Sequence, residues 1–268
     1  MVTDSPRADV AVIGGSGFYS FLPDPTEHVV ETPYGEPSAP IGIAEVAGRR
    51  VAFLPRHGRH HDHPPHAIPY RANAWALRSL GVRQVLAPCA VGGLRDTVAP
   101  GDLVVPDQLV DRTHRRIGSF VESGAVHLPF ADPYCPGVSA ALAGADADVR
   151  AGGTMVVVEG PRFSTRAESR HYADQGWDLI NMTGAPEAAL AREMGQCYAS
   201  LALVTDMDAG AESGEGVGQE QVFALFRQNL ERLTGLLTGA IEALPDPEGC
   251  TCATWADGVS LTYEVPGA

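Results

Sequence analysis

Short apolar runs alternate with amphipathic stretches along most of the chain, and glycine or proline follows many of them. The apolar runs predict strands over 9–13, 41–46, 50–54, 84–90, 102–105, 153–158, 178–182 and 197–205. Apolar residues at helical spacing predict helices over 70–80, 164–176, 186–194 and 220–244. Because strands alternate with helices in the second half, we expect an α/β sheet with parallel or mixed strands.

Turn and cap residues support several of these elements. Gly48 separates the strands over 41–46 and 50–54 and predicts a hairpin, and Gly81 is placed to end the first helix. Thr165 and Glu168 have the spacing of a capping box. No repeat or linker interrupts residues 1–245, so we expect one domain there. Residues 246–268 are polar and rich in proline and glycine, and we expect a tail that is loose or packed on a neighbour.

The composition is that of a globular protein. Of 268 residues, 44% are hydrophobic and 19% are charged, which is enough for a large core without a disulfide or metal. No stretch of 18 apolar residues predicts a transmembrane helix, and residues 1–9 lack the pattern of a signal peptide, so we expect a cytoplasmic protein. The formal net charge of −14 argues against nucleic acid as the main partner but allows a small anion in a locally basic pocket.

All 19 basic residues are arginine. The absence of lysine excludes Schiff-base chemistry through lysine, attachment of pyridoxal phosphate and a Walker-type phosphate loop. A genome rich in G and C accounts for this bias, so it singles out no individual arginine.

Several predicted strands end in residues that suit an anion. Ligands of open α/β sheets bind where the strands end. These ends offer the hydroxyls of Ser16 and Thr183, the guanidinium of Arg56 and the imidazole of His57. They also offer the backbone amides of Ala90 and Gly92. Arginine forks onto phosphate oxygens, and small residues let backbone N–H groups approach. The sequence therefore predicts an anion site.

Simpler interpretations of these segments stay open. The glycines from 14 to 17 lack the spacing of a dinucleotide-binding loop, because residue 20 is serine. Arg56 and His57 could form an ordinary surface pair. The five histidines between 57 and 66 could bind a metal, although they lie on a proline-rich loop rather than at i, i+4 spacing on a helix.

Asp206 and Asp208 form a second polar group. On a strand, a spacing of two would put both carboxylates on one face. A protonated Asp can donate to a purine N7 while a carboxylate accepts from the N6 amine. Phe163 and Met182 offer apolar contacts for a sugar and a base face. A phosphate at one end, a purine at the other and a sugar between them is the substrate geometry of a nucleoside phosphorylase.

The five cysteines suit a reducing compartment. Cys89, Cys135 and Cys197 have apolar neighbours and are interpreted as small buried residues. Cys250 and Cys252 could bind a metal, form a strained disulfide or do neither. Their C-x-C spacing lacks the second cysteine pair of a zinc site, so we expect no metal there.

Nine short segments match one family, in order, through residues 1–244. They lie at 13–17, 32–38, 56–59, 70–73, 107–113, 159–164, 181–183, 186–187 and 205–208. With these segments the chain resembles the 5′-methylthioadenosine phosphorylases, within the trimeric purine nucleoside phosphorylase superfamily. The resemblance implies a nucleoside phosphorylase domain over 1–245 with a central mixed sheet flanked by helices. It also implies a homotrimer, possibly assembled further into a hexamer, with no metal or organic cofactor and inorganic phosphate as co-substrate.

The resemblance also implies roles for individual positions. The phosphate site would comprise Ser16, Arg56, His57, Cys89, Ala90 and Thr183. The nucleoside would contact Phe163, Ser164, Met182, Asp206, Asp208, Gln219, Val222 and Phe223, and His127 of a neighbouring subunit. Catalytic roles would fall to Asp206, Asp208 and His57. Cys89 replaces a threonine of many relatives with a poorer donor, and Gln219 would make the 5′ end of the pocket more polar.

The expected reaction is phosphorolysis of 5′-methylthioadenosine to adenine and 5-methylthioribose 1-phosphate. In the family, Asp at position 206 is typical of enzymes that read 6-aminopurines, whereas enzymes for 6-oxopurines typically have Asn. A phosphorylase for adenosine, inosine, guanosine or methylthioinosine is the main alternative. A hydrolase that uses water in place of phosphate, and a binding module without turnover, are the others.

Overall fold

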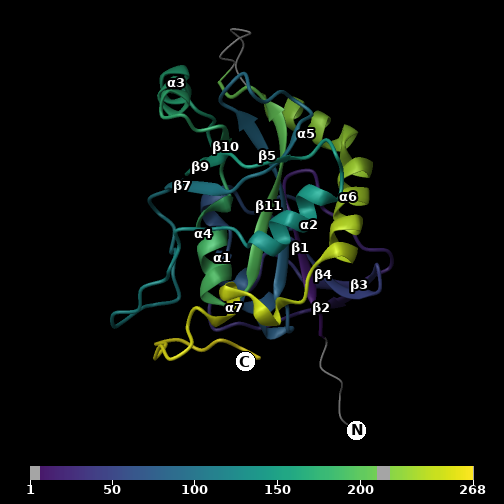
Figure 1. Ribbon diagram of the computed structural model, residues 1–268, viewed down its shortest axis with the longest axis vertical. Helices are drawn as coiled ribbons and strands as arrows, with labels where there is room; N and C mark the ends of the chain where they lie inside the picture. The colour runs from purple at the N-terminus through teal and green to yellow at the C-terminus, as the bar shows by residue number, and fades with distance from the viewer. Residues whose placement is uncertain (1–6, 210–217, 268) are drawn as a thin grey trace.

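The central feature of the computed structural model, which describes residues 7–209 and 218–267, is a mixed sheet with helices on both faces (Figure 1). The strands are β1 (Val10–Gly14), β2 (Thr26–His28), β3 (Ile41–Val46), β4 (Arg49–Pro55), β5 (Gln84–Gly93), β6 (Leu103–Val105), β7 (Gln108–Arg112), β8 (Arg150–Ala151), β9 (Thr154–Val158), β10 (Leu179–Asn181) and β11 (Cys197–Asp206). The α-helices are α1 (Tyr70–Ser79), α2 (Pro136–Gly144), α3 (Arg166–Asp174), α4 (Gly184–Glu193), α5 (Gln219–Gln228), α6 (Leu230–Ala243) and α7 (Thr251–Thr254). The predicted α/β class with a mixed sheet is confirmed.

Both faces of the sheet are buried, because alternate residues of its strands enter different cores. Ala11 and Ile13 of β1 pack with α1 and α4, whereas Val10 and Val12 pack with α2 and α6. Figure 1 shows the same division, with α1 and α4 on one side of β5 and β11, and α2 and α6 on the other. A strand covered on both faces reads as a continuous apolar run, as the sequence has it.

The strand order brings several chain segments to one edge. The parallel pairs β4–β1, β1–β5 and β5–β11 direct the carboxyl ends of four strands the same way. β10 starts beside Gly93 at the end of β5 and runs back antiparallel to it, and because β10 is short, its last residue Asn181 still lies beside Ala90 near that edge. Residues that follow these five strands can therefore meet in space.

Local signals in the sequence are confirmed where they were strongest. The strands β3 and β4 pair as an antiparallel hairpin around Gly48, which has a positive φ of 71°. Thr165 and Glu168 form the predicted capping box of α3. The pattern missed β2, β7, β8, α2 and α7.

The helix predicted over 220–244 is wrong in one respect, because the structure has two helices there. The first ends at Gln228 and the second begins at Leu230, with Asn229 at φ −99° and ψ 4° between them. The side chain of Asn229 donates to the carbonyl of Leu225, 3.0 Å away. Such a local hydrogen bond competes with helix continuation and turns the chain.

The segment after Leu244 packs on its own chain, although the sequence left it loose or on a neighbour. Gln84 Nε2 donates to the carbonyl of Pro245 over 2.9 Å, and Tyr263 Oη donates to that of Glu193 over 2.9 Å. Cys252 in α7 is buried. Across the described residues, none of the helices has the length and apolar character needed to cross a membrane.

Candidate active site

A pocket of about 330 Å³ lies where the strand ends meet, a size within the usual range for small-molecule sites. It is lined by fourteen of the fifteen residues to which the family resemblance assigned a role. These are Ser16, Arg56, His57, Cys89, Ala90, Phe163, Ser164, Met182, Thr183, Asp206, Asp208, Gln219, Val222 and Phe223. His127, which the resemblance assigns to the site of a neighbouring subunit, is exposed and does not line this pocket.

Arg56 supplies the positive charge of the pocket. It follows β4 directly, is only 1% exposed, and forks onto Glu187 of α4, with Nε and Nη2 at 2.6 and 2.8 Å from the carboxylate. Burial opposes the charge, but the neighbouring Glu187 carboxylate outweighs it and raises the pKa of Arg56 above its ordinary value. The remaining terminal nitrogen, Nη1, lies 3.4 Å from the carbonyl of Pro88 and is the one not engaged by Glu187. A fixed, permanently charged donor therefore faces the anion end.

Glu187 is a residue whose role the sequence did not reveal. Its carboxylate also accepts a hydrogen bond from Tyr198 Oη at 2.8 Å, and Glu187 is itself buried. Burying an ion pair removes both charges from water, and this cost is offset only by good geometry and additional hydrogen bonds. Glu187 thus orients the Arg56 guanidinium without lining the pocket.

His57 is a neutral imidazole whose free nitrogen can only accept. Its Nδ1 lies 2.9 Å from the carbonyl of His63, so Nδ1 carries the proton and donates it. Burial lowers the pKa of His57 to about 3, so the ring is uncharged at neutral pH. His61 stacks on it with ring centroids 4.3 Å apart. The Nε2 atom of His57 therefore suits a ligand O–H group, such as that of monohydrogen phosphate.

Asn181 positions the segment that carries the Thr183 hydroxyl of the predicted anion site. Its Oδ1 accepts from the backbone N–H groups of Thr183 and Gly184, both at 2.7 Å, and its Nδ2 donates to the carbonyl of Ala90 at 3.1 Å. The Thr183 segment after β10 is thereby tied to β5. Cys89 is buried beside Arg56, and burial raises the pKa of its thiol to about 12, so it meets a ligand as a neutral S–H group.

The two aspartates line the part of the pocket beside Gly92, three residues along β5 from the Cys89 segment near Arg56, but not for the reason that the sequence suggested. Asp206 is the last residue of β11 and Asp208 lies beyond the strand, in a turn. A register shift in the pairing with β5, between Val204 and Asp206, changes the local twist. The expectation of two carboxylates on one face of a regular strand is therefore wrong, although both side chains reach the same cavity.

Asp206 is poised between its two charge states. Burial raises its pKa to about 6, while the hydrogen bond from the Thr205 hydroxyl, 2.8 Å from Oδ2, lowers it and the charge of Asp208 raises it. The Thr205 hydroxyl also lies 3.1 Å from the carbonyl of Val91. Since a hydroxyl has one proton, a protonated Asp206 could donate to Thr205 while Thr205 donates to Val91. Both forms of Asp206 thus have partners.

Asp208 presents an unused acceptor. It is only 3% exposed, and its Oδ2 has no hydrogen-bond partner among the described residues. Burial raises its pKa, against hydrogen bonds from Ser169 and Ser164 that lower it. A buried carboxylate oxygen without a donor is costly unless a ligand supplies one. An amine N–H of a purine is a donor of that kind.

Apolar and polar groups close the rest of the cavity. Phe163 and Met182 lie among its lining residues, together with Val222 and Phe223 of α5, and Phe223 meets His61 edge-on at 5.7 Å. Gln219, the first residue of α5, is the polar member of this part. The histidine-rich loop brings no three ligand atoms together among the described residues, so the alternative of a metal site there has no support.

Gly92 allows the aspartates and β10 to approach closely. A methyl group on Gly92 would lie 2.9 Å from Ile180 Cγ2 and 3.1 Å from Asp206 Oδ1 and from Asp208 Cβ. We expect Gly92→Ala to lower kcat/KM by about 10- to 100-fold, because it would displace the two aspartates to which the resemblance assigns catalytic roles, and a displacement of catalytic groups by about 1 Å has that cost. Gly235→Ala, where nothing lies within 4 Å of the added methyl, is the control. Equal steady-state kinetics of the two variants would contradict this account.

Comparisons with known proteins agree with the geometry. A family model described as the phosphorylase superfamily matches residues 9–242. The chain is 56% identical to a purine nucleoside phosphorylase of Streptomyces coelicolor, over 97% of this chain and 98% of that protein. It is also 56% identical to an S-methyl-5′-thioadenosine phosphorylase of Mycolicibacterium smegmatis, over 96% and 99%.

A solved structure shares the fold as well. Methylthioadenosine phosphorylase from Schistosoma mansoni, in complex with adenine, matches with a TM-score of 0.84 and 35% identity, over 88% of this chain and 91% of that one. The family model spans most of the chain, and the two bacterial relatives align over almost their whole length. This chain therefore belongs to the phosphorylase superfamily, among the relatives of the S-methyl-5′-thioadenosine phosphorylases that its sequence motifs indicate.

Proposed function

We propose that this protein is a pentosyltransferase that cleaves 5′-methylthioadenosine with phosphate, giving adenine and 5-methylthioribose 1-phosphate. The observation that carries the proposal is one cavity with a fixed arginine at one end and two raised-pKa aspartates at the other. The relatives named S-methyl-5′-thioadenosine phosphorylase support the same substrate.

The phosphate would lie between the hydroxyls of Ser16 and Thr183, the backbone at Cys89 and Ala90, and Arg56. His57 Nε2 would accept a hydrogen bond from the P–O–H group, which leaves the other phosphate oxygens for the donors. The fixed dipoles and charge orient the phosphate toward C1′ without reorganisation during the reaction. Attack on C1′ needs no covalent enzyme intermediate, and we propose that the reaction uses no metal or organic cofactor.

The purine would lie against Asp206 and Asp208. Asp206 would donate a proton or a hydrogen bond to N7, drawing electrons from the glycosidic bond, while the open Oδ2 of Asp208 would accept from a purine N–H group. The sugar would then develop oxocarbenium character, which the phosphate anion stabilises. Phe163, Ser164 and Met182 would hold the base and ribose.

The 5′ substituent would occupy the part lined by Val222, Phe223 and Gln219. Two apolar groups suit a methylthio group, and Gln219 could instead hydrogen-bond a 5′-hydroxyl. We further propose a cytoplasmic homotrimer, possibly assembled into a hexamer, in which His127 of a neighbouring subunit approaches the 5′ end. Light scattering of the purified protein measures the number of subunits.

A phosphorylase for adenosine or for 6-oxopurine nucleosides is the second candidate, because one relative at 56% identity is named a purine nucleoside phosphorylase. The mismatch of a 6-oxo group with a site built for an amine costs about 1–3 kcal/mol. We therefore expect methylthioadenosine to be preferred over inosine.

One assay separates these functions. Purified protein is mixed with methylthioadenosine, adenosine or inosine, each with and without phosphate, and the free base is measured. We expect adenine to appear only with phosphate and fastest from methylthioadenosine. Release in phosphate-free buffer would indicate a hydrolase, faster release from inosine would overturn the account of base selection, and binding without release would indicate a module that only binds.

A further inference from the structure

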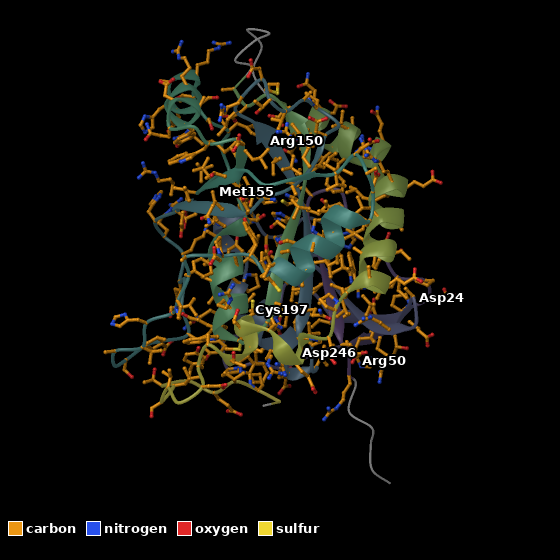
Figure 2. The ribbon with its side chains drawn as sticks, viewed as in Figure 1. Asp24, Arg50, Arg150, Met155, Cys197 and Asp246 are labelled. Carbon is orange, nitrogen blue, oxygen red and sulfur yellow. The ribbon has the colours of Figure 1, made fainter. Side chains whose placement is uncertain are left out.

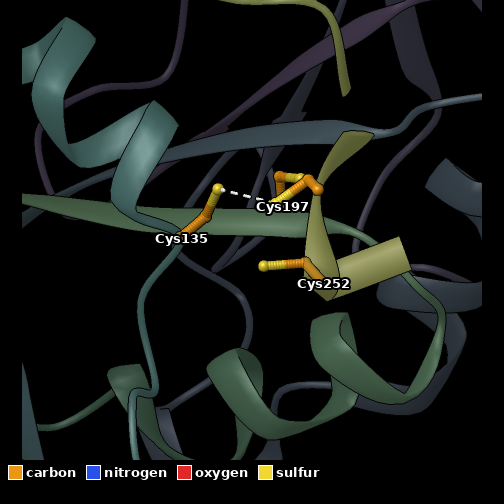
Figure 3. Close-up of side chains that lie close together, drawn as sticks. Cys135, Cys197 and Cys252 are labelled. Carbon is orange, nitrogen blue, oxygen red and sulfur yellow. Dashed lines mark hydrogen bonds between the residues drawn. The ribbon is translucent and has the colours of Figure 1, made fainter. Parts of the chain in front are cut away.

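A group of four cysteines lies outside the pocket and takes no part in the proposed reaction. Cys135, Cys197, Cys250 and Cys252 are all free thiols, and their sulfur atoms all lie within 4.8 Å of one another. Three of the four residues are buried and Cys250 is half-buried. The side chains of Cys135, Cys197 and Cys252 converge from three separate segments (Figure 3). Cys250 and Cys252 of the C-x-C motif are thus joined by a second pair, Cys135 and Cys197, which lies at least 53 residues earlier in the chain.

We propose that these four cysteines bind one Zn²⁺ ion in a closed structural site. Zinc bound by four thiolates is tetrahedral with Zn–S bonds of about 2.3 Å, which places neighbouring sulfur atoms about 3.8 Å apart. The Sγ atoms of Cys135 and Cys250 are 3.6 Å apart, and the remaining separations need only small side-chain adjustments. Soft thiolate ligands in this arrangement favour zinc over magnesium or calcium.

The backbone around the group is already ordered for such a site. Cys135 is the N-cap of α2, where the helix dipole favours a thiolate. Cys197 is the first residue of β11, and its N–H group donates to the carbonyl of Arg83 at 2.8 Å. Cys252 lies in α7, and Cys250 is its N-cap. All four cysteines therefore lie in or directly beside a helix or strand. Four thiolates complete a tetrahedral zinc site, so no coordination position is left for a substrate or water.

The position of the group indicates a structural rather than a catalytic role. Cys197 and Asp206 are the two ends of β11, a ten-residue strand that spans about 30 Å. Cys197 pairs with Gln84 of β5, and Gln84 Nε2 donates to the carbonyl of Pro245, so the chain after α6 meets the sheet at this place (Figure 2). A metal at this place would tie the segment after Leu244 to α2 and β11, and it would stabilise the folded state by mass action.

The first test measures metal in the wild-type protein. The chain is expressed with added zinc, purified under reducing conditions without a metal-affinity column, and analysed by atomic spectrometry. We expect one zinc per chain. Replacement by Co²⁺ should give the visible absorption of a tetrahedral tetrathiolate. Protein without zinc or cobalt, whether it contains two disulfides or five free thiols by intact mass after alkylation, would overturn the proposal.

Matched variants connect the metal with these residues. The double variant Cys250→Ser, Cys252→Ser should lose the zinc, whereas Cys89→Ser, which changes the fifth cysteine, should keep it. Loss of the metal should lower Tm by about 10 °C. Reversible removal of zinc from the wild-type protein by a strong chelator gives the same comparison if the double variant does not fold. Retention of zinc by the double variant, or an unchanged Tm on removal of zinc, would contradict the structural site.

Discussion

Replacing Asp206 with alanine is expected to lower kcat for methylthioadenosine by about 10²–10⁴-fold, with a much smaller change in KM. Proton donation to the leaving base contributes that much when it occurs in the transition state. Asp206 is half-buried at the end of β11, and the other carboxyl group of the pocket, that of Asp208, is proposed to accept a hydrogen bond through its unpartnered Oδ2. We therefore expect no other group of the described pocket to replace Asp206 as the acid.

Steady-state kinetics at saturating phosphate measure the effect. Asp148→Ala is the matched control, because it removes an Asp whose side chain is 87% exposed and does not line the pocket. A turnover of Asp206→Ala near that of the control would show that the leaving base is activated by another group. An increase in KM with an unchanged kcat would assign Asp206 to binding alone.

The pH dependence tests the same residue through its charge. Burial raises the pKa of Asp206 from its usual range to about 6, so the protonated fraction in the free enzyme falls as pH rises through 6. If the acid form reacts, the ratio of wild-type kcat/KM to that of Asp206→Asn should fall about tenfold per pH unit above 6. Taking the ratio at each pH cancels the titration of phosphate itself. A ratio that rises with pH would indicate that the carboxylate is the reactive form.

The sequence predicts best where a local signal decides the structure. The hairpin around Gly48 and the capping box of Thr165 and Glu168 need only neighbouring residues, and both are present. The edge strand β7 has no such signal, because it is half polar and is defined by its pairing with β9. The break at Asn229 is also invisible to helical periodicity, since the apolar spacing continues through it.

The pocket could be predicted because its residues follow strands. Parallel strands gather their carboxyl ends, so short motifs at those ends mark a common site. The spacing of motifs along the sequence does not show which side chain holds another side chain in place. Glu187 lies 131 residues from Arg56, and Cys135 lies 115 residues from Cys250, and only the fold brings each pair together.

Replacing Glu187 with glutamine is expected to lower the free energy of unfolding by about 3–5 kcal/mol. The variant leaves the buried Arg56 guanidinium without its counter-ion, and breaking one side of a buried ion pair has that cost. Chemical denaturation at one fixed protein concentration measures the change. Tyr198→Phe is the control, because it removes the 2.8 Å hydrogen bond to Glu187 and a longer 3.4 Å contact with Ser200 Oγ but leaves the ion pair, and it should cost about 1 kcal/mol. Equal losses in the two variants would contradict the role of charge.

A double variant then separates stability from function. Arg56→Met together with Glu187→Leu removes both charges, and apolar replacement of a buried ion pair is often neutral or stabilising. We expect its stability to return to within about 1 kcal/mol of the wild type, while the KM for phosphate rises at least 100-fold because the fixed donor at the anion end is gone. That outcome would mean that the chain keeps this buried pair for phosphate binding. A double variant that stays unstable but retains phosphorolysis would instead make Arg56 a structural residue and would move the anion site to Ser16, Thr183 and the backbone of β5.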